Sequence, residues 1–461
     1  MLARGIRSYH RPASLVQALE LTGQGMVPLA GGTRLLASPV EISSVLELSS
    51  LGLSGIELRD GDLHIGALTT LAEIAESPLV AVATVGLLSD ACRLHRASPM
   101  LRNAATLGGE AVYAAHDSEV VAALLALNAV FVIASRQGTV ESPALRFLRS
   151  HTEDLAGGAL VTSILIPGRP EGAAIERLAV VPSAPPVLAV VVTISVTRDD
   201  HCARARIALT GLETSPSRVL EAEARLEGSP GGEISLERCL EQIERRAPFR
   251  HDAHASAGYR RALARVLTRR AFERAVERAR AHAPEADPPP EAPRVQSQSS
   301  LEYFTSGVIH LMLNGQRRQL HVEARTTLLQ ALREAGCYGV KHGCETGECG
   351  ACAVLLDGRP VNACITLALS AQGRRVQTVE GLGTPDALHP VQRAFVETGA
   401  VQCGYCTPAM ELCAKALLDA TPTPTESDVR EALAGCLCRC TGYVKPVQAV
   451  MQAARVLREQ S

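Results

Sequence analysis

Eleven of the 14 cysteines of this 461-residue chain lie between residues 337 and 440. Thiolates at such close spacing hold zinc or iron–sulfur clusters, or else form disulfides in exported proteins. The N-terminal stretch MLARGIRSYHRP lacks the apolar segment of an export signal, so we do not expect a disulfide scaffold. The cysteines therefore predict a metal or cluster protein.

The first cysteine constellation has the spacing C-x4-C-x2-C with a fourth cysteine twelve positions later. Its members are Cys344, Cys349, Cys352 and Cys364. This spacing is typical of a plant-type [2Fe–2S] cluster, whereas four-thiolate zinc sites usually combine two C-x2-C pairs. Glycines in and before the loop let the backbone wrap closely and point N–H groups at electron-rich sulfurs. The constellation therefore predicts a [2Fe–2S] cluster.

The second constellation combines CGYC at 403–406 with CLCRC at 436–440. We take Cys403 and Cys406 as one pair of ligands and Cys438 and Cys440 as the other. From spacing alone zinc remains an alternative to iron, and Cys436 with Cys438 would make an equally good C-x-C pair.

The elements after residue 385 should bring these two motifs together. Helix-start signals predict four helices, with Pro390, Pro408 and Pro446 in first turns and Thr425 as a cap with Asp428 three residues on. Short connections make successive helices antiparallel. The connections between helices one and two and between helices three and four then fall at the same end of a bundle.

The segment before the bundle reads as a small sheet with one helix. An Asn-Gly between alternating runs predicts a hairpin over 306–323, and Thr326 or Thr327 should cap a helix that continues to residue 336. Strands at 352–358 and 374–381 complete a β-grasp pattern.

The first 281 residues alternate short strand-like and helical runs, which predicts an α+β fold. Two glycine doublets, in LAGGTRLLA (29–37) and LRNAATLGGEAV (101–112), could present backbone N–H groups to a diphosphate. Neither G-x-G-x-x-G nor a Walker A sequence is present. The long helix expected over 256–283 carries an apolar stripe of Tyr259, Leu263, Val266 and Val276.

These patterns divide the chain into an α+β domain at 1–281, a Pro/Ser-rich linker at 282–304, a ferredoxin-like domain at 305–382 and a helical domain at 383–461. The net charge of −2 and pI near 6.7 argue against a nucleic-acid or anionic-membrane surface. No run is long enough to span a membrane. We expect a cytoplasmic protein.

The motifs CETGECGAC, QCGYCTPAM and LCRCTGY together resemble the iron–sulfur part of the xanthine-oxidase family of molybdenum hydroxylases. Residues 5–280 resemble the flavin subunit of the same family through LAGGT, IGALTTLAEI, LRNAATLGGE, ILIP and YRRALARVLTRRA. The resemblance implies an FAD-binding domain of the xanthine dehydrogenase/CO dehydrogenase flavoprotein type, a plant-type ferredoxin domain and a four-helix [2Fe–2S] domain.

The resemblance also implies residue roles. It assigns the second cluster to Cys403, Cys406, Cys438 and Cys440, leaving Cys436 as a bystander, and gives Gln402 and Cys440 contacts with the pterin of a partner subunit. The FAD contacts would be Leu29, Ala30, Gly31, Gly32, Thr33, Arg34, Leu35, Thr106, Gly108, Gly109, Val112 and Glu119. Arg34, Glu110 and Glu119 depart from the family's usual residues there, and the first two resemble a sub-branch linked to purine-acting or selenium-linked enzymes.

The function implied is that of an electron-transfer subunit. Electrons would pass from a large molybdopterin-binding subunit, in a dimer of heterodimers, through two [2Fe–2S] clusters to FAD and an external acceptor, and the substrate would be a purine or another N-heterocycle such as xanthine or hypoxanthine. No catalytic residue for substrate oxidation is expected in this chain. The alternatives are a stand-alone NAD(P)H reductase with flavin and iron–sulfur centres, and a zinc-stabilised assembly protein without catalysis.

Overall fold

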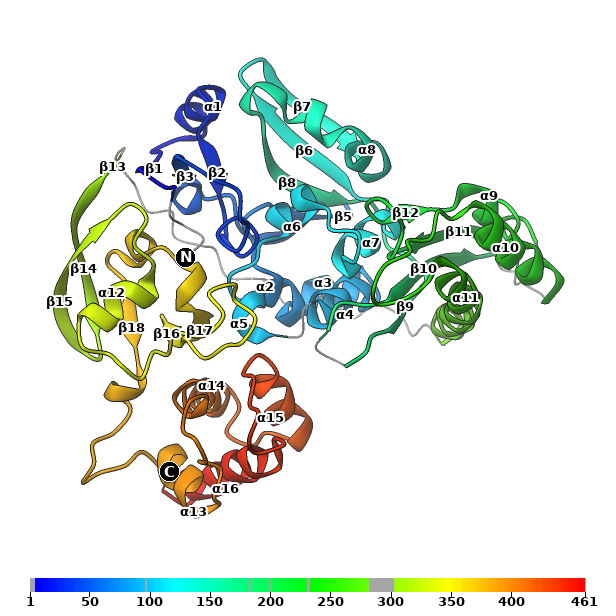
Figure 1. Cartoon of the computed structure of the whole chain (residues 1–461). Coiled ribbons are helices and arrows are strands. Elements are labelled where there is room, and N and C mark those ends of the chain that lie inside the picture. Colours follow the sequence, from blue (N-terminus) through cyan, green and yellow to red (C-terminus); the bar gives the residue numbers. More distant parts are fainter. Residues whose placement is uncertain are drawn as a thin grey trace.

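The computed structural model describes residues 5–95, 98–181, 184–197, 199, 201–229, 233–281 and 302–460. Figure 1 shows an N-terminal part coloured from blue to green, a ferredoxin-like part in yellow and a helical bundle from orange to red. Most of the expected linker, 282–301, lies outside the described residues. Within the described residues, no helix is long and apolar enough to cross a membrane.

The N-terminal part begins with two sheets. The first has the order β13–β1–β3–β2, and the second is antiparallel with the order β4–β5–β8–β6–β7. The strands are β1 (Ser8–Arg11), β2 (Val27–Leu29), β3 (Ser44–Glu47), β4 (Ile56–Arg59), β5 (Asp62–Gly66), β6 (Val130–Ser135), β7 (Gly138–Pro143), β8 (Leu160–Ile166) and β13 (Glu302–Phe304). This α+β pattern agrees with the sequence expectation.

Short helices pack on the second sheet and enclose the largest core. They are α2 (Leu71–Glu76), α3 (Pro78–Ala83), α4 (Leu87–Leu94), α6 (Leu107–Tyr113), α7 (Glu119–Ala126) and α8 (Ala144–Asp154). Two further short helices, α1 (Leu15–Gly23) and α5 (Pro99–Arg102), pack in other cores. The helix α7 is buried along its whole length, because alanine, valine and leucine fill every position after its first residue. The core fixes the start of α6, where the second glycine doublet lies.

A third sheet, β12–β11–β10–β9, closes the N-terminal part and packs on long helix α11 (Figure 1). The remaining elements are β9 (Gly172–Leu178), β10 (Leu188–Val196), β11 (Cys202–Leu209), β12 (Ser217–Arg218), α9 (Leu220–Glu223), α10 (Glu233–Arg246) and α11 (Ala257–Arg280). The apolar stripe expected on α11 is partly wrong, because Tyr259 and Val266 are exposed. Alanines and Phe272 make the buried face instead, since small residues allow the helix to approach the sheet closely.

The ferredoxin-like part is a five-stranded mixed sheet, β15–β14–β18–β16–β17, covered by one helix. It comprises β14 (Ser306–Leu313), β15 (Gln316–Glu323), α12 (Leu328–Glu334), β16 (Ala353–Leu356), β17 (Arg359–Asn362) and β18 (Arg375–Gln377). The hairpin and the β-grasp pattern are confirmed. Thr327, one of the two expected caps, caps α12 with a complete capping box.

The bundle consists of α13 (Pro390–Glu397), α14 (Thr407–Ala420), α15 (Glu426–Leu433) and α16 (Val444–Gln460). The four helices and the Thr425–Asp428 capping box are confirmed. Helix α16 begins two residues before the expected start at Pro446. Proline is tolerated there because the N–H groups of the first helical turn have no acceptor within the helix.

The two halves of the chain meet in several places, and two of these contacts fix the arrangement of the site. Strand β13, from the end of the expected linker, pairs antiparallel with β1, with Tyr303 opposite His10. Helix α5 lies between the ferredoxin-like part and the bundle (Figure 1). The flavin-type and cluster-type parts are therefore packed against each other, although the linker could have kept them apart.

Candidate functional site

The plant-type cysteines converge on one loop of the ferredoxin-like part. The thiols of Cys349 and Cys364 hydrogen-bond that of Cys344 and lower its pKa, and Cys364 does the same for Cys352. The backbone N–H groups of Thr346 and Cys349 point at the sulfur of Cys344, each at 3.4 Å. Sulfurs that meet one another and receive backbone N–H groups fit an electron-rich cluster.

Close packing explains the glycines of this loop. A Cβ on Gly343 would lie 2.6 Å from the sulfur of Cys349, and one on Gly347 would lie 2.6 Å from Ile365. Gly347 and Gly350 also have positive φ angles, which favour glycine. The loop is therefore shaped around its sulfurs.

The bundle cysteines meet in two pairs at one end of the bundle, as the helix connections predicted. The thiol of Cys406 contacts that of Cys438, and the thiol of Cys403 contacts that of Cys440. Burial raises the pKa of Cys438, but hydrogen bonds led by Thr441 outweigh burial and lower this pKa to about 7. This arrangement fits four thiolate ligands.

The structure separates Cys436 from these four. Cys436 is fully buried and its sulfur lies 3.8 Å from that of Cys413 in the bundle core. Among the described residues, no three His, Cys, Asp or Glu side chains are arranged around a single-ion position. The roles of the four paired cysteines stay predictions.

The two cysteine loops touch each other directly. The backbone N–H of Leu437, between the bundle cysteines, donates to the carbonyl of Cys349 at 2.9 Å. Tyr405 donates its hydroxyl to the carbonyl of His342 at 2.5 Å. A Cβ on Gly350 would lie 2.1 Å from the carbonyl oxygen of Gly435. The two candidate cluster sites are thus held together by direct backbone contacts, which leave no room for a side chain at Gly350.

Helix α5 ties both cysteine loops to the N-terminal part. Met100 is buried in the core of the bundle, whereas Leu101 packs on the core of the ferredoxin-like part. Arg102 pairs with Glu431 at 2.5 Å, and Asn103 donates to the carbonyl of Pro360 at 2.9 Å. The second glycine doublet follows this helix directly, so its position is fixed relative to both loops.

The first glycine doublet is the better candidate for a diphosphate. Within the described residues, none of the backbone N–H groups of Ala30 to Leu35 donates a hydrogen bond. By contrast, the N–H groups of Leu107 to Glu110 are satisfied by protein oxygens. A run of free N–H groups fits an anion such as the diphosphate of FAD.

Two cavities adjoin these loops. One of about 240 Å³ lies between Ala30–Gly32, Thr106 and the ferredoxin-like part. The other, of about 250 Å³, has Thr33, Arg34 and Glu110 on one side and Thr346 and Glu348 of the cysteine loop on the other. Both cavities therefore lie between the candidate flavin loops and the ferredoxin-like part.

Of the remaining predicted FAD contacts, Leu35 and Val112 are half-buried, Gly108 packs against Ala67, and Gly109 is bonded to Thr106. Glu119 is 1% exposed on its side chain and lies in ion pairs with His95 and Arg177. These assignments stay predictions.

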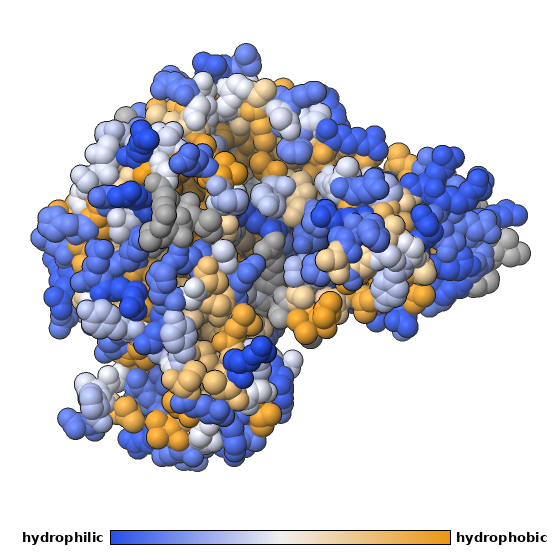
Figure 2. Space-filling model, viewed as in Figure 1, coloured by the Kyte–Doolittle hydropathy of each residue, from blue (hydrophilic) through white to orange (hydrophobic). Residues whose placement is uncertain are grey.

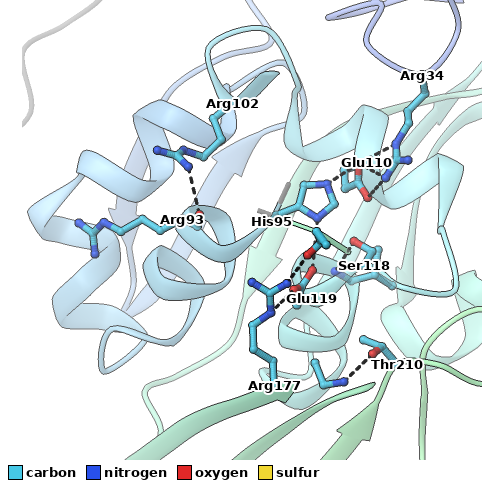
Figure 3. Close-up of polar contacts among 12 residues, drawn as sticks. Arg34, Arg93, His95, Arg102, Glu110, Ser118, Glu119, Arg177 and Thr210 are labelled. Carbon is cyan, nitrogen blue, oxygen red and sulfur yellow. Dashed lines mark hydrogen bonds and ion pairs between the residues drawn. The ribbon is translucent and has the colours of Figure 1, made fainter. Parts of the chain in front are cut away.

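The buried partners of Glu119 were not foreseen. A chain of alternating charges runs Arg34–Glu110–His95–Glu119–Arg177 (Figure 3), with contacts of 3.0 Å, 3.2 Å, 3.6 Å and 3.1 Å. All five side chains are at most 14% exposed. The opposite charges at Arg34 and Glu110, both departures from the family's usual residues, are the sequence signal that could have indicated a compensating network.

Glu411, on α14, is a buried acid of the bundle with one polar neighbour, Gln392. Burial raises the pKa of Glu411 to about 7, and the hydrogen bond from Gln392 offsets this effect only in part. The folded state therefore retains a proton that the unfolded state loses at about pH 4.5.

We expect the bundle to lose stability as pH rises from about 4.5 to 7, by roughly 3 kcal/mol from Glu411. Glu411→Gln should remove this loss, while the exposed control Glu426→Gln should keep it. Chemical denaturation at pH 5 and pH 7.5 measures the difference. Equal pH slopes for wild type and Glu411→Gln would contradict the assignment.

The comparisons with known proteins agree with this geometry. Residues 4–169 match the FAD binding domain in molybdopterin dehydrogenase, and 184–275 match the CO dehydrogenase flavoprotein C-terminal domain. Residues 311–375 match the 2Fe-2S iron-sulfur cluster binding domain, and 378–451 match a [2Fe-2S] binding domain.

Relatives match each half of the chain separately. The nicotinate dehydrogenase small FeS subunit of Eubacterium barkeri is 49% identical over 146 residues, which is 32% of this chain and 93% of the relative. The xanthine dehydrogenase iron-sulfur-binding subunit of Escherichia coli O157:H7 is 43% identical over 150 residues, which is 32% of this chain and 94% of the relative. A chain of the CO dehydrogenase from Oligotropha carboxidovorans superposes with a TM-score of 0.54 at 27% identity, over 59% of this chain and 97% of that chain.

Fold and site together define an electron-transfer flavoprotein fused to two [2Fe–2S] domains. The chain belongs to the xanthine-oxidase family of molybdenum hydroxylases, as its combined FAD and iron–sulfur subunit.

Proposed function

We propose that this chain carries electrons from a large molybdopterin-binding subunit, through the bundle cluster and the plant-type cluster, to FAD and an external acceptor. The observation that carries the proposal is the direct contact of the two cysteine loops, in which Leu437 donates to the carbonyl of Cys349. A [2Fe–2S] cluster passes one electron at a time, whereas FAD exchanges electrons singly or in pairs. The work of the chain is to hold these groups in order.

Each step of the order rests on a contact of this chain. The four bundle cysteines would hold the cluster nearest the partner, since the resemblance gives Gln402 and Cys440 contacts with the pterin and both residues are exposed. Cys344, Cys349, Cys352 and Cys364 would hold the second cluster. The free N–H groups of Ala30 to Leu35 would bind the FAD diphosphate. They lie next to the cavity that is lined on its other side by Thr346 and Glu348 of the plant-type loop.

The partner should dock on the exposed end of the bundle. Gln402 and Cys440, the expected pterin contacts, are both exposed. Leu437 and Val444 leave 58% and 55% of their surface exposed there, and Figure 2 shows apolar side chains among charged ones on the bundle. Exposed apolar residues around functional groups are typical of a protein interface.

Leu437→Asp should weaken binding of the molybdopterin subunit at least tenfold, because it places a charge in the middle of the docking surface. The matched control is Val140→Asp on β7, which is 60% exposed in the N-terminal part. Affinity of the purified subunits, by calorimetry, gives the result. If both variants bind as the wild type does, the docking surface lies elsewhere.

The substrate proposed for the complex is an N-heterocycle, and a purine such as xanthine or hypoxanthine in particular. The relatives named for nicotinate and xanthine support the wider class, and the sub-branch resemblance at Arg34 and Glu110 supports the purine. We also propose the domain limits 1–281, 282–304, 305–382 and 383–461, a dimer of heterodimers, and a cytoplasmic location.

Co-expression with a large molybdopterin-binding chain tests the proposal. We expect a complex with about four irons, FAD and molybdenum that reduces a dye with xanthine or hypoxanthine. Turnover of NADH by this chain alone, with no molybdenum partner retained, would favour the reductase. A colourless zinc protein would favour the assembly role.

A further inference from the structure

The cavity between Arg34, Glu110, Thr346 and Glu348 has buried carboxylates at and behind its wall, next to the proposed diphosphate site. Glu110 lines this cavity and is 2% exposed on its side chain, and Glu119 is buried behind it. Two buried carboxylates beside a diphosphate would repel it, because all three groups are negative. Buried carboxylates are also strongly unfavourable unless cations pair with them. Something must therefore compensate both of them.

His95 is the residue that joins the two carboxylates. It follows α4 as its C-cap and is 4% exposed. Its Nε2 lies 3.2 Å from Glu110 and its Nδ1 lies 3.6 Å from Glu119. Figure 3 shows the imidazole between the two acids, with Arg34 and Arg177 closing the ends.

The five side chains of this network carry a net positive charge when His95 is protonated. Arg34, Arg177 and a protonated His95 give three positive charges, and Glu110 and Glu119 give two negative ones, so the sum is +1. Burial lowers the pKa of His95, but the two carboxylates outweigh burial and raise this pKa to about 9. The imidazolium form is thus the one present at neutral pH.

The other ionisable groups around His95 do not replace its charge. Arg102 is paired with Glu431, and Cys92 is a buried thiol whose pKa is raised by burial. Arg93 donates to the carbonyl of Ala75 and pairs with Asp90. Tyr113 lies against the guanidinium of Arg34, and Glu348 on the far wall adds one more negative charge.

We propose that His95 is a positioning residue of the flavin site: as an imidazolium it bridges Glu110 and Glu119, gives the buried network a net positive charge and allows the diphosphate of FAD to bind at the first glycine loop. This inference rests on the proposed function. It goes beyond that function by assigning FAD retention to a residue outside the two glycine motifs, and by explaining why acids are tolerated at positions 110 and 119.

The test is a double-mutant cycle on FAD affinity in the full chain. His95→Gln lowers the charge sum from +1 to 0, and His95→Gln with Glu110→Gln restores it to +1. We expect the single variant to bind FAD at least tenfold more weakly at pH 7, and the double variant to recover to within about threefold of wild type. His201→Gln, at the far end of the third sheet, is the matched control.

The pH dependence provides a readout that packing alone would not move. The wild-type dissociation constant for FAD, measured by flavin fluorescence, should be flat from pH 6 to 8 and rise near pH 9. His95→Gln should remove this rise. If His95→Gln does not fold, the wild-type pH dependence still decides, since a dissociation constant for FAD that stays flat through pH 9 would overturn the role of His95.

The outcomes distinguish failure of the proposed electron-transfer function from failure of the role of His95. A wild-type chain that retains iron but binds no FAD overturns the proposed function together with this inference. FAD binding that is equal in wild type and His95→Gln, or a double variant weaker than the single one, overturns the role of His95 alone.

Discussion

Replacing Cys344 with alanine should halve the iron content of the chain, from about four to about two atoms. Cys344 is exposed, so its loss removes a cluster ligand without opening a cavity in a core. The bundle ligands lie on separate loops and should keep their cluster. Reduction should then give one paramagnetic iron signal where wild type gives two.

A matched variant separates ligand loss from damage to the domain. Cys337 belongs to the same ferredoxin-like part, is 6% exposed and is not a predicted ligand. Cys337→Ala should lower stability, since it leaves a small cavity, and should keep both clusters. Iron retention by Cys344→Ala, or iron loss by Cys337→Ala, would contradict the ligand set.

Gly350→Ala should push the two cysteine loops apart. The new Cβ would lie 2.1 Å from the carbonyl oxygen of Gly435, which is backbone and has no side-chain freedom to move aside. The adjacent Leu437–Cys349 hydrogen bond should be lost with it. We expect a destabilisation of roughly 1–3 kcal/mol from overpacking, and a weaker magnetic interaction between the two reduced clusters.

Gly373→Ala is the control for this variant. Gly373 has φ +74, close to the +69 of Gly350, but a Cβ there meets no atom within 4 Å. Both substitutions therefore carry the backbone strain of a left-handed position, and only Gly350→Ala adds the collision. The loop contact would have no structural role if the two variants melted at the same temperature and showed the same spin interaction.

Local patterns were sufficient to predict that the cysteines of each constellation lie together, whereas the choice of Cys438 and Cys440 over Cys436 needed the family resemblance. Ligand spacing within a loop is a property of sequence, and the helix-start signals at Thr425 and Pro390 indicated where the bundle helices begin. The meeting of Cys406 with Cys438 followed from antiparallel helices alone. The same local signals placed the β-grasp sheet and its capped helix.

Contacts between distant segments could not be predicted in this way. Nothing in the tetrapeptide of α5 indicates that Met100 enters the bundle while Leu101 enters the ferredoxin-like part. Strand β13 pairs with β1, which lies nearly 300 residues earlier in the sequence. His95 has no periodic or motif context, and the sequence analysis did not connect Arg34 and Glu110 with a buried partner. Such features depend on tertiary packing, which overrides local preference.

The most direct test of the account is electron paramagnetic resonance on the anaerobically purified chain after chemical reduction, with metal analysis of the same sample. Eight thiolates in two sets predict two distinct [2Fe–2S] signals and about four irons per chain. A single signal, or zinc in place of iron, would contradict it.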